Sequence, residues 1–194
     1  MNFYEIDLSY MDYLHQVDSR VLIHNTSTHT RKFIAVRVLI NGYHYFVPLS
    51  SPDNKDFFTD SKGTKQIRKT TIPAIKRIIY DRDSSKSYLG KLLFNNMIPV
   101  PEGQYTEFNL NLESDIQYKT LLKKQLEILR TPKNKKDIEK RAQLMYHLKE
   151  SNAPYGYIKA TVHFKLLEEK CDEWELIHNQ LHIQSHNQEK VLSL

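Results

Sequence analysis

The dipeptide Asn41-Gly42, set between two runs of β-branched and aromatic residues, constrains the fold of this chain more than any other feature. A type I′ turn needs a positive φ at both central residues, and Asn-Gly suits that turn well. The run before it alternates in a way that is typical of a strand buried on one face. The alternating residues are Ile34, Val36, Val38 and Ile40. We therefore predict a β-hairpin within residues 31–55.

The open end of such a hairpin would gather groups that bind phosphate, because antiparallel strands bring the residues before the first strand beside those after the second. Hydroxyls, backbone N–H groups of a loop and cations together form a phosphate site by composition. The same composition is also typical of an ordinary turn flanked by solvated charges, so the residues alone leave both interpretations open. The residues concerned are His29, Arg31 and Lys32 before the hairpin, and Ser50, Ser51, Pro52 and Lys55 after it.

Composition indicates a globular protein with a basic surface. Of the 194 residues, 40% are hydrophobic and 26% charged, which is enough for a buried core. The net charge of +5, with 12 Tyr and 9 His, suits RNA, whose bases stack on aromatic rings, although a mildly basic globular protein would look similar. One cysteine, Cys171, excludes an intrachain disulfide. We find no membrane-spanning run and no signal peptide, so we expect a cytoplasmic protein without a membrane partner.

Strand patterns dominate the first half of the chain and helix patterns the second, which favours an α+β single domain over residues 1–194. We predict a compact, strongly twisted antiparallel sheet with helices packed against it. The expected strands lie within 2–7, 72–80 and 88–99, besides the hairpin. Ser9 is expected to cap the first helix, and residues 53–71 to form a surface loop, with room for a helical turn, anchored by Phe57 and Phe58.

Three helices are expected after residue 114. The first would expose Lys119, Lys123 and Lys124 in a row that could follow an RNA backbone. The second begins after Thr131-Pro132. The third extends past the rest of the domain, and we expect its tail after about residue 175 to be either a helical or a frayed extension.

Two constellations imitate metal sites, and we reject both. His178, His182 and His186 recur every four residues, but no further ligand is evident near them. Pro52-Asp53 with Glu168-Glu169-Lys170 imitates a nuclease signature, yet its second half lies in a helical pattern that could be a solvated face. We predict no metal and no cofactor.

Several segments, in order along the chain, resemble the ToxN/AbiQ endoribonucleases, the toxins of type III toxin–antitoxin and abortive-infection systems. The likeness reaches about Trp174. The segments are Met1–Ile6, Tyr10–Leu14, Tyr43–Pro52, Met97–Pro99, Tyr118–Arg130 and Leu166–Lys170.

The resemblance implies a metal-independent, sequence-preferring RNase whose sheet is distantly like that of the MazF/Kid toxins. The substrate's own 2′-OH would attack the adjacent phosphate and leave a 2′,3′-cyclic phosphate and a 5′-OH. A repeated small antitoxin RNA would inhibit the toxin through pseudoknot units, usually in a closed RNA–protein ring. Cellular or phage RNAs would be the substrates.

The resemblance also assigns residues. Its Thr/Ser-Ser-Pro motif falls on Ser50, Ser51 and Pro52, and its basic residue before the hairpin falls on Arg31 or Lys32. Two positions depart from the family pattern. Asp53 stands where the family often has Lys, with Lys55 two residues later, and Ser27 stands where the family has Tyr, with His29 nearby.

Cleavage would need charge stabilisation at the phosphorane and proton carriers. Arg31 or Lys32, Lys55 and the serine hydroxyls could supply the first, and His29 and His44 are candidates for the second. His44, the helical lysines Lys119, Lys123 and Lys124, and Arg130 are the predicted RNA-binding residues. Two alternatives stay open: a non-catalytic RNA-binding protein with the same basic surface, and a scaffold whose C-terminal helices bind a protein.

Overall fold

The computed structural model describes residues 1–23, 34–82 and 85–192, with the backbone alone at residues 34, 82 and 85 and from residue 179 onward. The strands are β1 Phe3–Ile6, β2 Ile34–Ile40, β3 Tyr43–Ser50, β4 Phe57–Thr59, β5 Lys65–Ile67, β6 Ile75–Arg82, β7 Ser85–Leu93, β8 Ile98–Pro99 and β9 Tyr105–Glu107. The helices are α1 Leu8–Val17, α2 Ile116–Leu129, α3 Pro132–Glu150, α4 Gly156–Lys159 and α5 Phe164–Leu192. Short 3₁₀ turns occupy Asn54–Asp56 (η1), Phe94–Asn96 (η2) and Leu110–Leu112 (η3).

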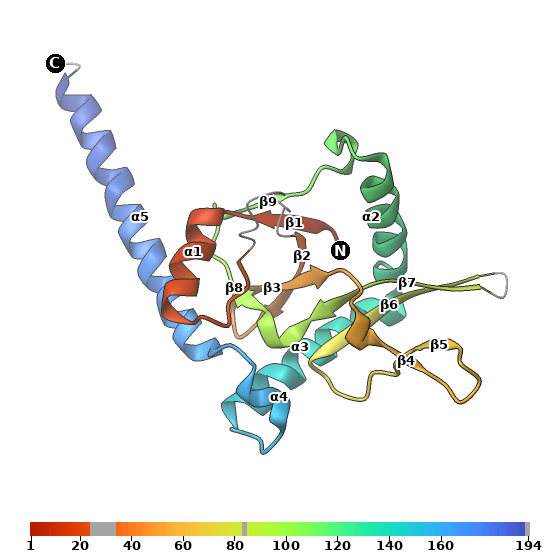
Figure 1. Ribbon diagram of the computed structural model, residues 1–194. Coiled ribbons are helices and arrows are strands. Elements are labelled where there is room, and N and C mark those ends of the chain that lie inside the picture. The colour runs from red at the N-terminus through yellow and green to blue at the C-terminus, as the bar shows by residue number, and fades with distance from the viewer. Residues whose placement is uncertain (24–33, 83–84, 193–194) are drawn as a thin grey trace.

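One antiparallel sheet, in the order β6-β7-β3-β2-β1-β9, organises the domain, and β8 pairs with β3 beside this path. In Figure 1 the helices surround the sheet: α2 lies beside β6 and β7, and α3 passes behind the strands. α1 and α5 lie side by side on the opposite side of the molecule from α2, and α5 projects well beyond the sheet. The expected α+β architecture with an antiparallel sheet is confirmed.

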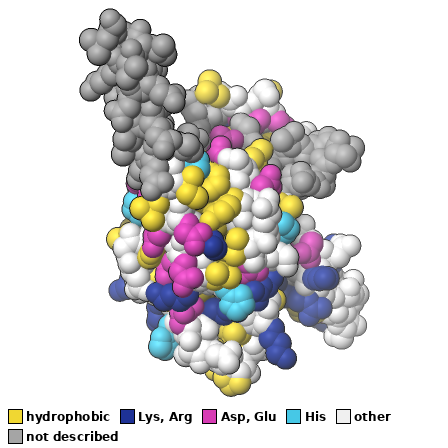
Figure 2. All heavy atoms as spheres, turned by 90° about the vertical axis from the view of Figure 1, so that its left-hand side faces the viewer, with side chains coloured by type: hydrophobic (Ala, Val, Ile, Leu, Met, Phe, Trp, Pro, Cys, Tyr) yellow, Lys and Arg dark blue, Asp and Glu magenta, His cyan; other side chains and the backbone are white. Residues whose placement is uncertain are grey.

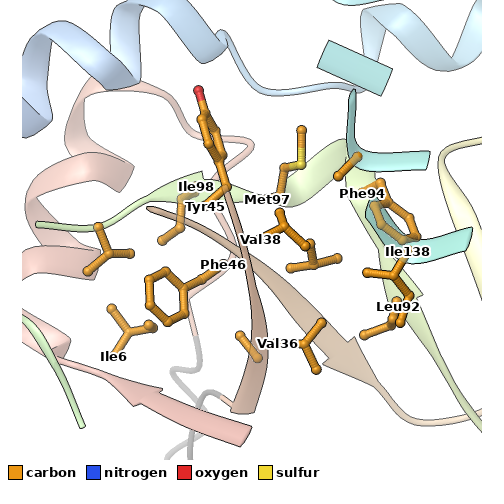
Figure 3. Close-up of a cluster of buried hydrophobic side chains, with 14 of the residues drawn as sticks. Ile6, Val36, Val38, Tyr45, Phe46, Leu92, Phe94, Met97, Ile98 and Ile138 are labelled. Atoms are coloured by element: carbon orange, nitrogen blue, oxygen red, sulfur yellow. The ribbon is translucent and has the colours of Figure 1, made fainter. Parts of the chain in front are cut away.

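The central hairpin forms as predicted. Asn41 and Gly42 have φ values of 50° and 88°, as a type I′ turn requires, and β2 pairs with β3 from Ala35↔Pro48 to Ile40↔Tyr43. Val36 and Val38 are buried and point into the core that Figure 3 shows between the sheet and the helices. The core residues labelled there are Ile6, Val36, Val38, Tyr45, Phe46, Leu92, Phe94, Met97, Ile98 and Ile138.

Three local predictions were wrong. The α1 N-cap is Asp7, whose carboxylate accepts hydrogen bonds from the backbone N–H groups of Ser9 and Tyr10, so Ser9 lies inside the helix. The segment 53–71 contains the expected helical turn, η1, but it then forms the small two-stranded sheet of β4 and β5, and Phe58 is 41% exposed instead of anchoring a loop. The strand expected over 88–99 breaks after β7, since η2 separates it from β8.

The helical half differs from the prediction at Glu168. α5 itself continues to Leu192 as one helix. Glu168 is not on a solvated face: it is buried on α5 and accepts hydrogen bonds from the Tyr45 and Tyr146 hydroxyls at 2.9 and 3.2 Å, and from Lys165 at 2.9 Å. A buried carboxylate with three donors fastens α5 to the sheet and to α3.

Candidate functional site

The serine loop, which we define as residues 50–52, lies where β3 ends. Ser50, the last residue of β3, pairs with Lys91 of β7 and is half-buried, whereas Ser51 and Pro52 are exposed. Strand pairing ends at Ser50, and Pro52 just beyond it has no N–H to donate. The Ser50 hydroxyl donates to the Ser51 carbonyl at 3.3 Å. Two hydroxyls therefore lie at the end of the interior strand β3, one of them open to solvent.

A buried ion-pair network holds the segment that follows this loop. The Lys91 ammonium lies 2.8 Å from Asp53 Oδ2 and 2.7 Å from Asp56 Oδ2, and the Arg77 guanidinium lies 2.9 Å from Asp56 Oδ1. The side chains of Lys91, Arg77 and Asp56 are 8%, 10% and 2% exposed. Two cations thus meet two carboxylates, and strands β6 and β7 are tied to η1, just beyond Ser51 and Pro52.

The pKa values of the two carboxyl groups follow from these contacts. Burial raises the pKa of Asp56, but hydrogen bonds from Lys91, from the Asp53 backbone and from Arg77 outweigh burial and lower that pKa to about 2. The hydrogen bond from Lys91 is also the main reason why the pKa of Asp53 lies below its usual value. Both groups are carboxylates at neutral pH, and Lys91 and Arg77 balance their charge.

Gly90 and Gln125 lie against the backbone of Ser50. A β-bulge at Ile78/Ile79 leaves Leu89 out of the pairing, and Gly90 takes a φ of +139°. A Cβ at Gly90 would come within 2.7 Å of the Ser50 carbonyl oxygen and 3.0 Å of Gln125 Nε2. Gln125, on the buried side of α2, donates to the Leu89 carbonyl at 2.8 Å. α2 therefore reaches the strands beneath the loop.

Sequence reasoning missed Lys91, Asp56, Gly90 and Gln125. Two of them left a signal: a glycine within a strand pattern often marks a bulge or a close backbone approach, and Gln125 stands at an apolar position of its helix. Lys91 and Asp56 left none, because their partners lie far away in the sequence.

Of the predicted catalytic residues, the structure places Ser50, Ser51 and Lys55 together. Lys55 lies on η1, with its side chain exposed and its N–H donating to Asp53 Oδ1 at 2.7 Å. His29, Arg31 and Lys32 lie outside the described residues.

His44 is not part of this group. It lies at the turn end of the hairpin, six residues from Ser50, which is about 20 Å along a strand. There its Nδ1 faces Glu102 at 3.3 Å and the Tyr105 hydroxyl at 3.4 Å. The hypothesis that His44 carries a proton at the serine loop is not supported by this placement.

The predicted RNA-binding residues of α2 divide into two pairs. The side chain of Lys119 donates to the carbonyls of Asn111 and Glu113, and Arg130 donates to Met1 and Asn2 beside a hollow of about 460 Å³ between the N-terminus and α2. Both therefore serve structural contacts. Lys123 and Lys124 are exposed, and the Lys124 ammonium lies 5.6 Å from the centre of the Tyr80 ring.

The face made by α1 and α5 differs in its charges from the surface around the serine loop. Figure 2 shows acidic and hydrophobic side chains in its middle and Lys and Arg side chains below them. Along α5, Asp172 accepts a hydrogen bond from the Tyr43 hydroxyl, and Glu173 pairs with Lys170. This mixed surface is a poorer match for a polyanion than the surface around the serine loop.

Two kinds of feature are absent from the described residues. No helix there is long and apolar enough to cross a membrane. No cluster of three or more His, Cys, Asp or Glu side chains in that part of the chain could hold a metal ion.

Fold and site define an α+β protein whose antiparallel sheet presents a pair of serines and a cation at the end of its central hairpin. The model of the family described as toxin ToxN of type III toxin–antitoxin systems matches residues 2–172, so the chain belongs to that family. Endoribonuclease ToxN of Bacillus thuringiensis subsp. kurstaki is 32% identical over 180 residues, which cover 89% of this chain and 84% of that protein. Endoribonuclease AbiQ of Lactococcus lactis subsp. lactis is 28% identical, with 88% and 87% covered.

Solved structures agree. One that describes selective toxin inhibition by a non-coding RNA pseudoknot has 30% sequence identity and a TM-score of 0.68, and covers 90% of this chain and 97% of its own. The predicted family and fold class are confirmed. The predicted likeness to MazF and Kid stays a prediction.

Proposed function

We propose that this chain is an endoribonuclease toxin that a pseudoknot-forming RNA holds inactive. Membership of the ToxN family and the names of the relatives support this proposal. The observation that carries it is the exposed Ser51 at the end of β3, beside Ser50 and Lys55, on a segment that a buried ion-pair network fixes.

The proposed reaction is transesterification with no metal. The substrate's 2′-OH attacks the adjacent phosphate, and the 5′-oxygen leaves with a proton, which gives a 2′,3′-cyclic phosphate and a 5′-OH. Lys55, the serine hydroxyls and the N–H groups of the loop stabilise the charge that develops on the phosphate. The predicted roles of Arg31, Lys32 and His29 stay part of this proposal, as does a preference for particular RNA sequences.

The Asp53 departure from the family pattern fits this chemistry. A free carboxylate next to the phosphate would repel it, but Lys91 lies 2.8 Å from Asp53 and neutralises its charge. Arg77 balances Asp56 in the same way. The ammonium of Lys55 is therefore left as the net charge of the segment.

The surface around the serine loop is also where we propose that the RNA partners bind. We propose that repeated antitoxin RNA units occupy it in a closed RNA–protein ring, and that cellular or phage RNAs are the substrates. Lys123 and Lys124 on α2 would contact the RNA backbone beside the site. We place the activity in the cytoplasm, where a single buried thiol such as Cys171 stays reduced.

The test compares Ser51→Ala with Ser19→Ala, a matched change at an exposed serine outside the site. Expression of the wild type or of Ser19→Ala should arrest growth and cleave RNA, and Ser51→Ala should do neither while it keeps the wild-type unfolding midpoint. Growth arrest by a well-expressed Ser51→Ala protein would contradict the assignment. RNA binding without cleavage by the wild type would favour the non-catalytic alternative, and neither binding nor cleavage would favour the scaffold.

A further inference from the structure

The two-stranded sheet of β4 and β5 forms a projecting arm, which we define as residues 57–69. It starts immediately after η1 and is separate from the main sheet. Figure 1 shows it projecting from the domain on the same side as the β6–β7 hairpin. The arm contains none of the residues of the serine loop, and the family resemblance gives it no role.

The base of the arm is tied to the serine loop. The Arg68 N–H donates to the Asp56 carbonyl at 2.8 Å, which closes the base of the arm on η1. The Phe57 ring meets the Tyr88 ring of β7 edge to face, with 5.6 Å between centroids. Asp56 is itself held by Lys91 and Arg77. The arm is therefore positioned by the same network that positions the loop.

The outer part of the arm carries uncompensated positive charge. Its cationic side chains are all exposed: Lys62, Lys65, Arg68 and Lys69. The carboxylate of Asp60 accepts hydrogen bonds from the N–H groups of Lys62 and Thr64, both at 2.9 Å, and so is used within the turn. Within the described residues, the ammonium groups of Lys62 and Lys69 make no ion pair.

Phe58 is the exposed aromatic ring among these charges, whereas the Phe57 ring is half-buried, with the Lys65 ammonium 4.2 Å from its centre. Phe58 is 41% exposed, and the Arg68 guanidinium lies 5.9 Å from the centre of its ring. Cations that follow a backbone, combined with an exposed ring on which a base can stack, are the features by which proteins bind single-stranded nucleic acid without reading its sequence. A second copy of the arm would bring like charges together, so the arm does not fit itself.

We propose that the arm binds single-stranded substrate RNA on one flank of the scissile phosphate, with its cations on the backbone and Phe58 under a base. That the bound RNA is a substrate rests on the proposed function. The binding of single-stranded RNA to the arm can be measured without cleavage.

The first test removes charge from the arm. Lys62→Gln, Arg68→Gln and Lys69→Gln are combined in a Ser51→Ala background, which prevents cleavage, and fluorescence anisotropy measures the binding of a labelled oligoadenylate about twenty nucleotides long. A variant with the same loss of charge on α3 is the control: Lys133→Gln, Lys136→Gln and Lys140→Gln. The three control lysines are exposed.

The arm variant should bind more weakly and depend less on salt. Three lost contacts to a single strand lower the slope of log affinity against log salt by about 2, so the gap between the arm variant and its parent should shrink about 16-fold between about 50 and 200 mM salt. The control should keep the parent slope. If the arm variant keeps it as well, the arm is a solvated surface and the inference is wrong.

The second test addresses stacking. In the same background Phe58→Ala should weaken oligoadenylate binding at least about fivefold, and Phe58→Trp should retain it, because any aromatic face can take a base. Equal affinity of Phe58→Ala and the parent would overturn this half of the inference. Thermal unfolding of each variant checks that the arm change leaves the domain folded.

Cleavage assays separate the two proposals. With Ser51 present, the arm charge variant should raise the KM for a long unstructured RNA and leave the kcat at saturation unchanged. If the wild type cleaves RNA but the arm variant matches it in salt slope and KM, the arm inference fails and the proposed function stands. If the wild type never cleaves but the arm variant loses affinity, the proposed function fails and the arm remains an RNA-binding surface.

Discussion

Replacing Asp56 with Asn tests the network that fixes the serine loop. Asp56 is 2% exposed, and its two oxygens bind Lys91 at 2.7 Å and Arg77 at 2.9 Å. The substitution keeps the shape of the side chain and removes its charge. It leaves two buried cations, with Asp53, itself 52% exposed, still bound to one of them.

The loss of stability expected for Asp56→Asn follows from the lowered pKa of Asp56 and from the cost of leaving a buried charge unpaired. Lowering the pKa of Asp56 from its usual 3.8 to about 2 corresponds to about 2 kcal/mol at about 1.36 kcal/mol per pKa unit. Removing one partner from a buried pair costs about 3 to 5 kcal/mol, because a charge is left without compensation. We therefore expect Asp56→Asn to lower the free energy of unfolding by about 3 kcal/mol, measured by urea denaturation at neutral pH.

Asp53→Asn is the matched control. It removes the other carboxylate from Lys91, but this carboxylate is half exposed, and such pairs contribute less than about 1 kcal/mol. Lys91 also keeps Asp56. Equal losses in the two variants, or a loss under about 1 kcal/mol for Asp56→Asn, would refute the view that burial makes Asp56 the important partner.

The stabilisation that Asp56 provides should decrease as the pH falls. Because the folded pKa of Asp56 is lowered, its stabilisation is present above the unfolded pKa near 4 and is lost as the pH falls toward about 2. The difference in stability between the wild type and Asp56→Asn should therefore narrow over that range. A difference that stays constant from neutral pH to about 2 would contradict the lowered pKa of Asp56.

Asp56→Asn should also lower kcat, because the serine loop loses part of the network that positions it. The decrease should be up to about 100-fold, which is the effect of misplacing a reacting group by an ångström.

Three further predictions concern the surroundings of the site. Gly90→Ala should destabilise the protein by about 2 kcal/mol, because a φ of +139° strains any side chain and the new Cβ would meet the Ser50 carbonyl oxygen. Urea denaturation measures the loss, and an unchanged free energy of unfolding would contradict this prediction. Lys123→Gln with Lys124→Gln should reduce the salt slope of RNA binding by about 1.4, whereas an unchanged slope would make this surface a solvated one. His44→Ala should keep kcat within about twofold of the wild type at every pH, since His44 lies about 20 Å from Ser50; a lost limb of the pH–rate profile would show that it carries a proton.

The central hairpin could be predicted because its signals are local. Asn41-Gly42 specifies its own turn, and the alternation of Val36 and Val38 specifies which face of β2 is buried. The serine loop followed from the hairpin, because the residue after a strand that ends at Ser50 must lie in the loop beyond the end of that strand. These inferences needed no knowledge of distant contacts.

The β4–β5 arm could not be predicted in the same way. Each of its strands has three residues, too few for an alternating pattern, and the arm is stabilised by the Asp60 turn and by the contact of Phe57 with Tyr88. The α1 cap was misassigned because Asp7 and Ser9 are both good caps and the choice depends on where β1 ends.

The ion pair between Asp56 and Lys91, which positions the serine loop, could not be predicted for a related reason. Asp56 looks like a surface residue in its polar segment, and Lys91 looks like an exposed strand residue. Their burial depends on β7 pairing with β3 at Ser50↔Lys91, a register that tertiary structure determines. Sequence reasoning therefore found the hydroxyls of the candidate site but not the groups that position them.

The chemistry of the cleaved RNA ends tests the central claim most directly. Purified wild-type protein and Ser51→Ala are incubated with RNA in EDTA, and the new ends are examined. The proposed function predicts that the wild type, and not Ser51→Ala, leaves 2′,3′-cyclic phosphate and 5′-OH ends. Products with a 5′-phosphate, or cleavage that EDTA abolishes and Mg²⁺ restores, would contradict it.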